Sequence, residues 1–441
     1  MDTYDIISVG FGAAALSIAI ALRDRGIKPR MVFLEKQSEF GWHTGMLLPG
    51  TKMQISYLKD LATLRDPTSY FTFLNYLHVK GRLVNFTNLS THLPLREEFN
   101  DYLKWCASHF DDVVQYNQEV MSVTPNGTPA GSFTVKTRDI TTGAVKELVG
   151  KQIIVATGGD KAIPAGLAGQ PLPEGVIHSS EFMNKVPQKF TNPHAEYRCA
   201  IIGGGQSAVE LSEEFSSRYP NSKVELFMKG SAMRPSDDSP FVNEIFDPES
   251  VDPFFNQDPK TRKQQLEENK LTNYAVVRLQ LLEHVYDKIY RQRFLNPDES
   301  TWALRIHTYR ELTGVKQLAD KKMQLQLKNV KTGEIVPKNE KYDLVILATG
   351  YRRNPFCHVL KSLQPLLEKP QEGEQFAVGR DYRVKFQPGK VANDAAIWLQ
   401  GSCESTHGLS DSLLSILAVR SAELVDSMTA ISGKGAKVSR L

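Results

Sequence analysis

The chain has 441 residues, which is too many for a single hydrophobic core and predicts two or three domains. Hydrophobic residues make up 41% of the sequence and charged residues 23%, as in ordinary globular proteins, and no apolar run reaches the ~20 residues of a membrane span. Lys and Arg outnumber Asp and Glu by only 53 to 50, so charge predicts neither a nucleic-acid partner nor a membrane partner.

Residues 5–16 predict a buried strand, a tight glycine turn and the start of a helix, the pattern of a dinucleotide-binding unit. Gly10 would let the chain turn sharply, Gly12 would let the backbone approach a pyrophosphate, and the small Ala15 would let the helix pack on the strand. The next apolar run ends in Glu35, whose carboxylate would accept a ribose diol and repel a 2′-phosphate. This unit therefore favours FAD or NAD over NADP, and an ordinary glycine turn in an α/β core is the alternative.

The stretch that follows, residues 36–67, mixes aromatic residues, amides and lysines without a clear period, as a loop lining a cofactor would. The alternative for Trp42 and Met53 is that they only fill a core. Residues 96–105 carry apolar side chains at helical spacing and predict a helix packed on the core. Two alternating runs on either side of a turn at residues 126–127 predict antiparallel strands.

Two buried strands, residues 152–155 and 344–347, are each followed by the tripeptide Ala-Thr-Gly. Small residues at these strand ends would let a cofactor or a crossing chain approach closely. A second nucleotide unit lies between them at residues 199–210 and contains three consecutive glycines, Gly203 to Gly205. Two such units in one chain predict two bound nucleotides.

The strand after the second unit does not end in an acid and runs into Lys229. With no carboxylate to repel a 2′-phosphate and a cation to meet it, this unit should prefer NADPH. A plain surface lysine is the alternative. The two units are therefore distinguished by charge, because Glu35 suits the diol of FAD and Lys229 the phosphate of NADPH.

The later segments are less specific. Asn243 and Asn273 stand among prolines and aromatic residues, which suits a polar small-molecule pocket and ordinary turns equally well. A charged helix is predicted over residues 260–270, and alternating residues from about 292 to 336 predict strands. Residues 401–420 predict a loop with a capping Ser or Asp and then an apolar helix. A helix start aimed at a flavin would stabilise the reduced ring, and a simple N-cap is the alternative.

Motifs along nearly the whole chain, in the same order, resemble the siderophore-associated N-hydroxylating monooxygenases, and the L-ornithine N5-monooxygenases are the most similar of them. These motifs are Gly10-Phe-Gly12, Trp42-His43, Met53-Gln54-Ile-Ser, Leu58-Lys59-Asp60-Leu, Arg65-Asp66-Pro67, Gly203-Gly-Gly205-Gln-Ser207-Ala, Asp238-Ser-Pro-Phe-Val-Asn243-Glu, Thr272-Asn273-Tyr274, Ala348-Thr-Gly350-Tyr and His407-Gly408-Leu-Ser410.

The resemblance implies an α/β fold with two Rossmann-like dinucleotide-binding domains, one for FAD and one for NADPH, and a small, mostly helical substrate region. The implied FAD-binding domain covers residues 1–195 and 341–441, and its second part carries a substrate-contacting helix. The NADPH-binding domain is inserted at residues 196–340 and includes a substrate segment at about 236–290. The resemblance also implies a homotetramer.

The resemblance further implies which residues bind each ligand. The residues expected to contact FAD are Gly10, Gly12, Ala15, Glu35, Lys36, Trp42, His43, Met53, Gln54, Val120, His407, Gly408, Leu409 and Ser410. Those expected to hold NADPH are Gly203, Gly204, Gly205, Gln206, Ser207, Lys229, Asn273, Tyr274 and Ala275. Those expected to surround the amino-acid substrate are Lys59, Asn243, Glu244, Asn273 and Ser410.

The reaction that the resemblance implies begins with reduction of FAD by NADPH, and O2 then adds to the reduced ring as a C4a-hydroperoxyflavin. The side-chain amine of L-ornithine takes the distal oxygen and becomes N5-hydroxyornithine, for hydroxamate siderophore or related natural-product biosynthesis. No acid or base side chain is expected, because the flavin carries the chemistry. The alternatives are an L-lysine N6-monooxygenase, since one methylene is worth only ~1–3 kcal/mol, and a non-catalytic FAD-binding redox scaffold.

The sequence departs from the family pattern at three positions. Ala13 follows Gly12 where the family usually has proline, which would loosen the first turn. Lys229 stands where arginine is common, so the phosphate contact becomes a point charge. Ala275 replaces a frequent serine and removes one hydrogen bond.

Metal binding and secretion are not expected. The four cysteines form no C-x-x-C pair and the ten histidines no H-E-x-x-H, so no metal site is predicted. Asp2 and Asp5 precede the apolar run at residues 6–22, which argues against a signal peptide and favours a cytoplasmic protein with reduced thiols. The last three residues, 439–441, read Ser-Arg-Leu and are close to the peroxisomal Ser-Lys-Leu address, so a peroxisomal location is the alternative in a eukaryote.

Overall fold

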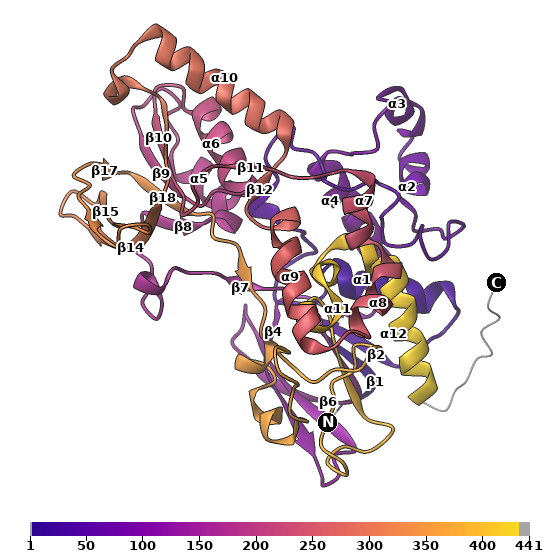
Figure 1. Cartoon of the computed structure of the whole chain (residues 1–441). Coiled ribbons are helices and arrows are strands. Elements are labelled where there is room, and N and C mark those ends of the chain that lie inside the picture. The colour runs from indigo at the N-terminus through magenta and orange to yellow at the C-terminus, as the bar shows by residue number, and fades with distance from the viewer. Residues whose placement is uncertain (1, 432–441) are drawn as a thin grey trace.

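The computed structural model describes residues 2–431, which form two main sheets with helices packed around them (Figure 1). Within these residues the first sheet has seven strands in the order β3-β2-β1-β6-β5-β4, and β20 pairs with β6. Strands β2, β1, β6 and β20 run parallel, whereas β4, β5 and β6 pair antiparallel, as the sequence predicts for β4 and β5. The strands are β1 (Asp2–Val9), β2 (Met31–Leu34), β3 (Val114–Gln115), β4 (Gln118–Asn126), β5 (Ser132–Asp139), β6 (Val145–Val155) and β20 (Ala396–Leu399).

Helix α1 (Ala13–Asp24) is buried between the first sheet and a layer of helices. Ile18 and Leu22 pack in the core of the sheet together with Trp398 of β20. Leu16 and Ile20 face a second core rich in aromatic rings. This helical layer contains α2 (Phe73–Val79), α3 (Leu83–Asn88), α4 (Arg96–Ala107) and, against α1, the C-terminal α12 (Leu417–Ile431). The helix predicted at residues 96–105 is confirmed as α4.

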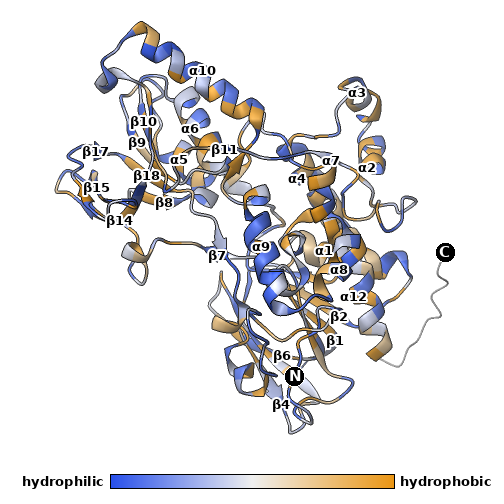
Figure 2. Cartoon of the chain, viewed as in Figure 1, coloured by the Kyte–Doolittle hydropathy of each residue, from blue (hydrophilic) through white to orange (hydrophobic). Residues whose placement is uncertain are grey.

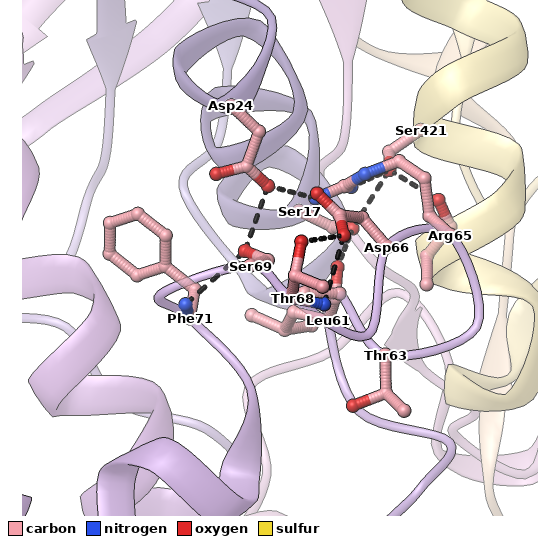
Figure 3. Close-up of polar contacts among 12 residues, drawn as sticks. Ser17, Asp24, Leu61, Thr63, Arg65, Asp66, Thr68, Ser69, Phe71 and Ser421 are labelled. Atoms are coloured by element: carbon pink, nitrogen blue, oxygen red, sulfur yellow. Dashed lines mark hydrogen bonds and ion pairs between the residues drawn. The ribbon is translucent and has the colours of Figure 1, made fainter.

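A polar cluster fixes the loop after residue 60 to both α1 and α12 (Figure 3). Arg65 forms an ion pair with Asp24 of α1 at 2.5 Å and donates a hydrogen bond to the hydroxyl of Ser421 on α12 at 3.0 Å. Ser69 donates to the same Asp24 carboxylate at 2.9 Å. Asp66 caps its own turn by accepting bonds from Thr68. Arg65 and Asp66 belong to the segment that was predicted to line a cofactor. Their contacts stabilise the packing of this loop on α1 and α12.

The second sheet has five parallel strands in the order β13-β10-β9-β18-β8, counted within the described residues. They are β8 (Val176–His178), β9 (Arg198–Ile202), β10 (Lys223–Phe227), β13 (Leu304–His307) and β18 (Leu344–Leu347). One face packs on α5 (Phe182–Lys189), α6 (Gln206–Arg218) and α10 (Leu279–Leu295). The other face packs on a small antiparallel sheet of β14 (Arg310–Gln317), β15 (Met323–Asn329), β16 (Ile335–Val336) and β17 (Lys341–Tyr342).

A buried carboxylate lies between the second sheet and this small sheet. Glu225 of β10 accepts contacts from Arg305 at 2.7 Å, His307 at 2.8 Å and Lys338 at 2.7 Å. Burial alone would raise the pKa of the Glu225 carboxyl, but these three partners outweigh it and lower that pKa to about 2. The carboxylate is thus ionised and fully paired.

Two short strands carry the chain between the main sheets. β7 (Asp160–Lys161) follows the Ala-Thr-Gly end of β6, and β19 (Tyr351–Arg352) follows that of β18; they pair antiparallel (Figure 1). Strands β8 and β18 belong to the second sheet although the boundaries predicted at 195/196 and 340/341 leave them outside the inserted domain. The three-residue β8 gives too short a signal to be read from sequence. We propose that the domain boundaries lie at β7 and β19.

A helical segment connects β10 to β13. It contains β11 (Arg234–Pro235), α7 (Pro240–Asn243), α8 (Val251–Phe255), α9 (Pro259–Asn273), β12 (Val276–Val277) and α10. The predicted charged helix extends over the whole of α9, which begins at Pro259 after the capping side chain of Asp258. Strands were expected from residue 292, but α10 continues to Leu295 because Val285, Ile289 and Gln292 pack inward at helical spacing. No helix within residues 2–431 is long and apolar enough to cross a membrane.

Candidate active site

The first glycine turn joins β1 to α1. Gly10 has φ +95°, and a Cβ on it would lie 2.5 Å from the carbonyl oxygen of Ala156, so only glycine fits beside the end of β6. Gly12 is the N-cap of α1 without a side-chain hydrogen bond, and no described atom lies within 4 Å of its Cβ position. Ala15 is fully buried beneath the turn. The helix start therefore offers open space and its first backbone N–H groups to a pyrophosphate.

Glu35 lies at the end of β2 beside this turn and is almost completely buried. Its Oε2 accepts a hydrogen bond from the N–H of Phe11 at 2.8 Å, and its Oε1 accepts one from the N–H of Gln37 at 2.9 Å. The carboxylate is thereby fixed next to the glycine turn, and its remaining lone pairs suit ribose hydroxyls. Lys36, which follows it, is exposed. These residues fit the adenosine half of FAD.

The second glycine turn, between β9 and α6, has the same construction. Gly203 has φ +147°, and a Cβ on it would lie 2.3 Å from the carbonyl oxygen of Ala348. Gly205 is the N-cap of α6 without a side-chain hydrogen bond. Ala156 and Ala348 both open an Ala-Thr-Gly tripeptide, so each of these tripeptides makes room for a glycine turn. The tripeptides were expected to let either a cofactor or a crossing chain approach closely, and the structure shows that a crossing chain does.

Several predicted NADPH residues gather at the second turn. A Cβ on Gly205 would lie 3.3 Å from the Cα of Ala275, a residue in the left-handed region with φ 58°. Gln206, at the start of α6, accepts a hydrogen bond from the N–H of Arg278 at 2.8 Å. Ser207 and Gly204 are half-buried on the same turn, where Met228 packs 3.1 Å from the Cβ position of Gly204. The segment after α9 therefore packs directly against the turn expected to hold NADPH.

Lys229 follows β10 at the edge of the second unit and is 69% exposed. Its Nζ pairs with Glu311 at 2.7 Å, which lowers the pKa of the Glu311 carboxyl. The position suits a 2′-phosphate, because nothing acidic stands at the strand end itself. The phosphate would replace Glu311 as the partner of this lysine. The Lys229–Glu311 ion pair joins residues 82 positions apart and was not predictable from the sequence.

The predicted substrate residues come from separate segments. Lys59 pairs through its Nζ with Asp247 at 3.0 Å, and both side chains are partly exposed. Asn243 donates to the carbonyl of Asp238 at 3.0 Å. The hydroxyl oxygen of Ser410 is buried and has no hydrogen-bond partner among residues 2–431. Since buried polar groups are normally satisfied, a ligand that hydrogen-bonds to this hydroxyl would satisfy it. Glu244, which follows Asn243, is exposed.

A contact that sequence reasoning missed joins the segment after α9 to the loop before α12. The hydroxyl of Tyr274 donates to Glu404, the first residue of α11 (Glu404–His407). Burial raises the pKa of the Tyr274 hydroxyl and that of the Glu404 carboxyl, and the positive charge of Arg353 opposes both increases. Asn273 and Tyr274 are half-buried, so the predicted NADPH residues lie against the predicted flavin loop. A single Glu, with no pattern around it in the sequence, gives no signal for such a contact.

The flavin loop is fixed by the side chain of His407. Its imidazole is buried, stacks on the Tyr382 ring at 4.0 Å, and its Nε2 lies 3.0 Å from the carbonyl oxygen of Arg380. Burial lowers the pKa of His407 to about 3, so the ring is neutral. Gly408 makes the following turn with φ 86° and Leu409 is buried. This imidazole holds the loop in place, and the contacts that His407 to Ser410 were expected to make with a flavin stay a prediction.

The remaining predicted FAD residues surround the first unit. His43 has φ 48°, and burial together with the charges of Arg353 and Arg96 lowers its pKa to about 4. The backbone N–H of Trp42 donates to Asn100 at 2.9 Å. The others differ in exposure: Met53 is buried in the aromatic core, Gln54 is exposed, and Val120 is half-buried beside a bulge in β4. For Met53 the core-filling alternative agrees with this placement.

A second missed contact holds the two units together. Arg96, at the start of α4, forms a two-pronged ion pair with Glu210 of α6 at 2.7 and 2.8 Å, and both side chains are nearly buried. Gln206 donates to the same carboxylate at 2.8 Å. The start of the second helix is thereby fixed to the helical layer of the first unit.

The site has no feature of a metal centre among the residues described: no group of three or more His, Cys, Asp or Glu side chains is placed to hold an ion. Cys106, Cys199 and Cys403 are buried and Cys357 is exposed, and all four are free thiols. The Ser-Arg-Leu end at residues 439–441 lies outside the described residues.

Comparison with known proteins gives one consistent family. A family model described as L-lysine 6-monooxygenase/L-ornithine 5-monooxygenase matches residues 2–353. The chain is 60% identical over 442 residues to L-ornithine N(5)-monooxygenase of Ajellomyces capsulatus, covering 99% of this chain and 93% of that protein.

Two solved structures resemble the chain over nearly its full length. Ornithine hydroxylase PvdA from Pseudomonas aeruginosa is 35% identical with a TM-score of 0.88, covering 97% of this chain and 99% of that one. Ornithine N-hydroxylase KtzI from Kutzneria sp. 744, which holds reduced FAD, NADP⁺ and L-ornithine, is 34% identical with a TM-score of 0.87 and the same coverage.

Proposed function

Because the chain belongs to the L-lysine 6-monooxygenase/L-ornithine 5-monooxygenase family, we propose that it hydroxylates the side-chain amine of L-ornithine to N5-hydroxyornithine with FAD, NADPH and O2. The observation that carries this proposal is the pair of glycine turns with the same construction and different charge. Glu35 stands beside the first and Lys229 beside the second. One chain thus offers a site for a flavin and another for its phosphorylated electron donor.

The residues of the first unit would position FAD, which, when bound, would accept electrons from NADPH and activate O2. The start of α1 would receive its pyrophosphate and Glu35 its ribose hydroxyls. The start of α6 would receive the pyrophosphate of NADPH, and Lys229 its 2′-phosphate. The Tyr274–Glu404 contact would then lie between the two nucleotides, because Tyr274 is among the proposed NADPH residues and Glu404 precedes the proposed flavin loop.

The substrate amine must lose a proton before it can act as a nucleophile. A lysine-like amine with a pKa of ~10.4 is only about one part in a thousand neutral near pH 7.4. The cation of Lys59 suits the substrate carboxylate, which would take the place of Asp247. Ser410 and the amides of Asn243 and Asn273 would fix the α-amino end without adding charge.

The assembly and location are further parts of the proposal. We propose a homotetramer, a cytoplasmic location, and a product that serves hydroxamate siderophore or related natural-product biosynthesis. The support is the resemblance of the motifs to the family and, for location, the four free cysteines, which suit a reducing compartment. A peroxisomal location through residues 439–441 remains the alternative, and deleting these three residues from a fluorescent fusion tests it.

Mass spectrometry of the products tests the reaction. Purified protein with FAD is given ornithine, lysine or the two shorter diamino acids, each with NADPH and with NADH. We expect a product 16 mass units heavier from ornithine with NADPH, and little from lysine or NADH. Hydroxylation of lysine in preference to ornithine would support the alternative substrate, and flavin binding without any hydroxylated product would support a redox scaffold.

A further inference from the structure

Helix α10 lies on the outer edge of the molecule, beside α6 (Figure 1), and carries both hydrophilic and hydrophobic residues along its length (Figure 2). Several of its large apolar side chains are exposed. Val285 and Ile289 face the core of the second unit, so the helix is already anchored on its inner side. The exposed apolar residues are 53 to 77% accessible and are Leu279, Tyr286, Tyr290, Phe294 and Leu295. Exposed apolar side chains gathered on one element indicate a contact surface, and Tyr and Phe are enriched in such surfaces.

Three residues of this row, Leu279, Tyr286 and Tyr290, have the spacing of a helix that pairs with another helix. Positions 279, 283, 286, 290 and 293 follow one another at intervals of four and three residues, the seam of a coiled coil. Two of the five positions are charged and exposed: Glu283 lies before the tyrosines and Arg293 after them. We call these five residues, Leu279, Glu283, Tyr286, Tyr290 and Arg293, the α10 seam.

The charges of the seam select one orientation. If two copies of α10 pack antiparallel about a two-fold axis at position 288, Tyr286 faces the partner's Tyr290 and Glu283 faces the partner's Arg293. If they pack parallel, Glu283 meets a second Glu283 and Arg293 a second Arg293, which repel. The seam positions from 283 to 293 are therefore self-complementary in the antiparallel arrangement, as an isologous interface requires, and Leu279 would face residue 297 of the partner, just beyond the end of its α10.

We propose that the α10 seam is a contact surface between two copies of this chain, packed antiparallel about a two-fold axis. The inference rests on the proposed homo-oligomer and not on the proposed reaction, because α10 contributes to neither glycine turn. Both signs of charge border the seam, with Asp287 and Arg291 also exposed, whereas a helix that lies on a lipid surface is mainly basic. A second copy fits these charges and a membrane does not.

Charge exchange tests the proposed register. Glu283→Arg and Arg293→Glu each place like charges opposite one another twice per interface and should raise its dissociation constant. The variant with both substitutions restores opposite charges and should recover the wild-type mass. Since Arg293 also lies 5.6 Å from the Trp302 ring, each variant is first checked for an unchanged melting temperature and flavin content.

Tyr286→Lys with Tyr290→Lys tests the apolar part of the seam, and Ile335→Lys, at an equally exposed position on β16, is the control. Sedimentation velocity between 0.1 and 50 μM should show the wild type and the control as the larger species. The double tyrosine variant should dissociate at least tenfold more readily into a smaller one. These concentration and fold values are order-of-magnitude choices that suit micromolar interfaces.

Three results would overturn the proposal: a monomeric wild type, a double tyrosine variant with wild-type mass, or an exchanged-charge variant that fails to recover. Binding of wild-type protein to phosphatidylcholine vesicles that is lost in the tyrosine variant would assign the face to a membrane and also overturn it. Hydroxylation of ornithine per bound flavin is measured on the same samples. Its absence in the wild type would reject the proposed reaction and leave the sedimentation result intact.

Discussion

Removing the Lys59 side chain should weaken ornithine binding and leave flavin reduction unchanged. A charge-assisted hydrogen bond to the substrate carboxylate is worth about 1.5–3 kcal/mol. The carboxylate must first displace Asp247, which pairs with Lys59 at 3.0 Å, and a partly exposed pair of this kind is worth about 0.2–1 kcal/mol. The difference is roughly 0.5–2.8 kcal/mol, so Lys59→Ala should raise the ornithine KM by roughly 2- to 100-fold.

The assay follows ornithine-dependent NADPH oxidation and product formation under steady-state conditions, and flavin reduction under anaerobic conditions. The Lys59→Ala enzyme should be reduced by NADPH at the wild-type rate, since Lys59 belongs to neither glycine turn. Lys80→Ala, at an exposed lysine after α2, is the matched control and should change neither quantity. An unchanged ornithine KM in Lys59→Ala would remove this residue from the substrate site.

Three further substitutions test other contacts. Asp247→Asn should lower the ornithine KM by roughly 1.5- to 5-fold, because it frees Lys59 from its partner; steady-state kinetics checks this, and a higher KM would show that Asp247 itself holds substrate. Lys229→Ala should raise the KM for NADPH more than that for NADH, and an equal change in both would place the 2′-phosphate elsewhere. The Glu225→Gln variant should have a lower melting temperature than the wild type at pH 7, and its melting temperature should change less as the pH is lowered. The ionised Glu225 stabilises the folded wild type at pH values above 4.5, its pKa in the unfolded chain. This stabilisation is lost as the pH falls toward about 2, the pKa in the folded protein. Plots of melting temperature against pH that run parallel for the two proteins from pH 7 to 2 would refute this role of Glu225.

Much of the chemistry was predictable because it is local in sequence. The two glycine turns, the acid at residue 35 and the helix at α4 each depend on a few neighbouring residues, and the structure places them as expected. The sequence also predicted that the Ala-Thr-Gly ends admit a close approach, but not that a glycine turn makes it at both Ala156 and Ala348.

The missed features depend on residues far apart in the chain. Tyr274 and Glu404 are 130 residues apart, and Arg96 and Glu210 are 114 apart. A single sequence contains no signal for which charged residue meets which across such distances. The end of helix α10 was wrongly expected to be a strand, because its outward face carries apolar residues and obscures the one-sided pattern that a surface helix usually shows.

The central claim is that one chain holds two different nucleotides at two separate glycine turns. Gly205→Val tests it most directly: this residue has an extended backbone that any residue adopts, but its Cβ would already lie 3.3 Å from Ala275. We expect the purified variant to keep its FAD and its reduction by dithionite, and to lose anaerobic reduction by NADPH. Reduction by NADPH at the wild-type rate, or a wild-type protein that binds no flavin, would contradict the account.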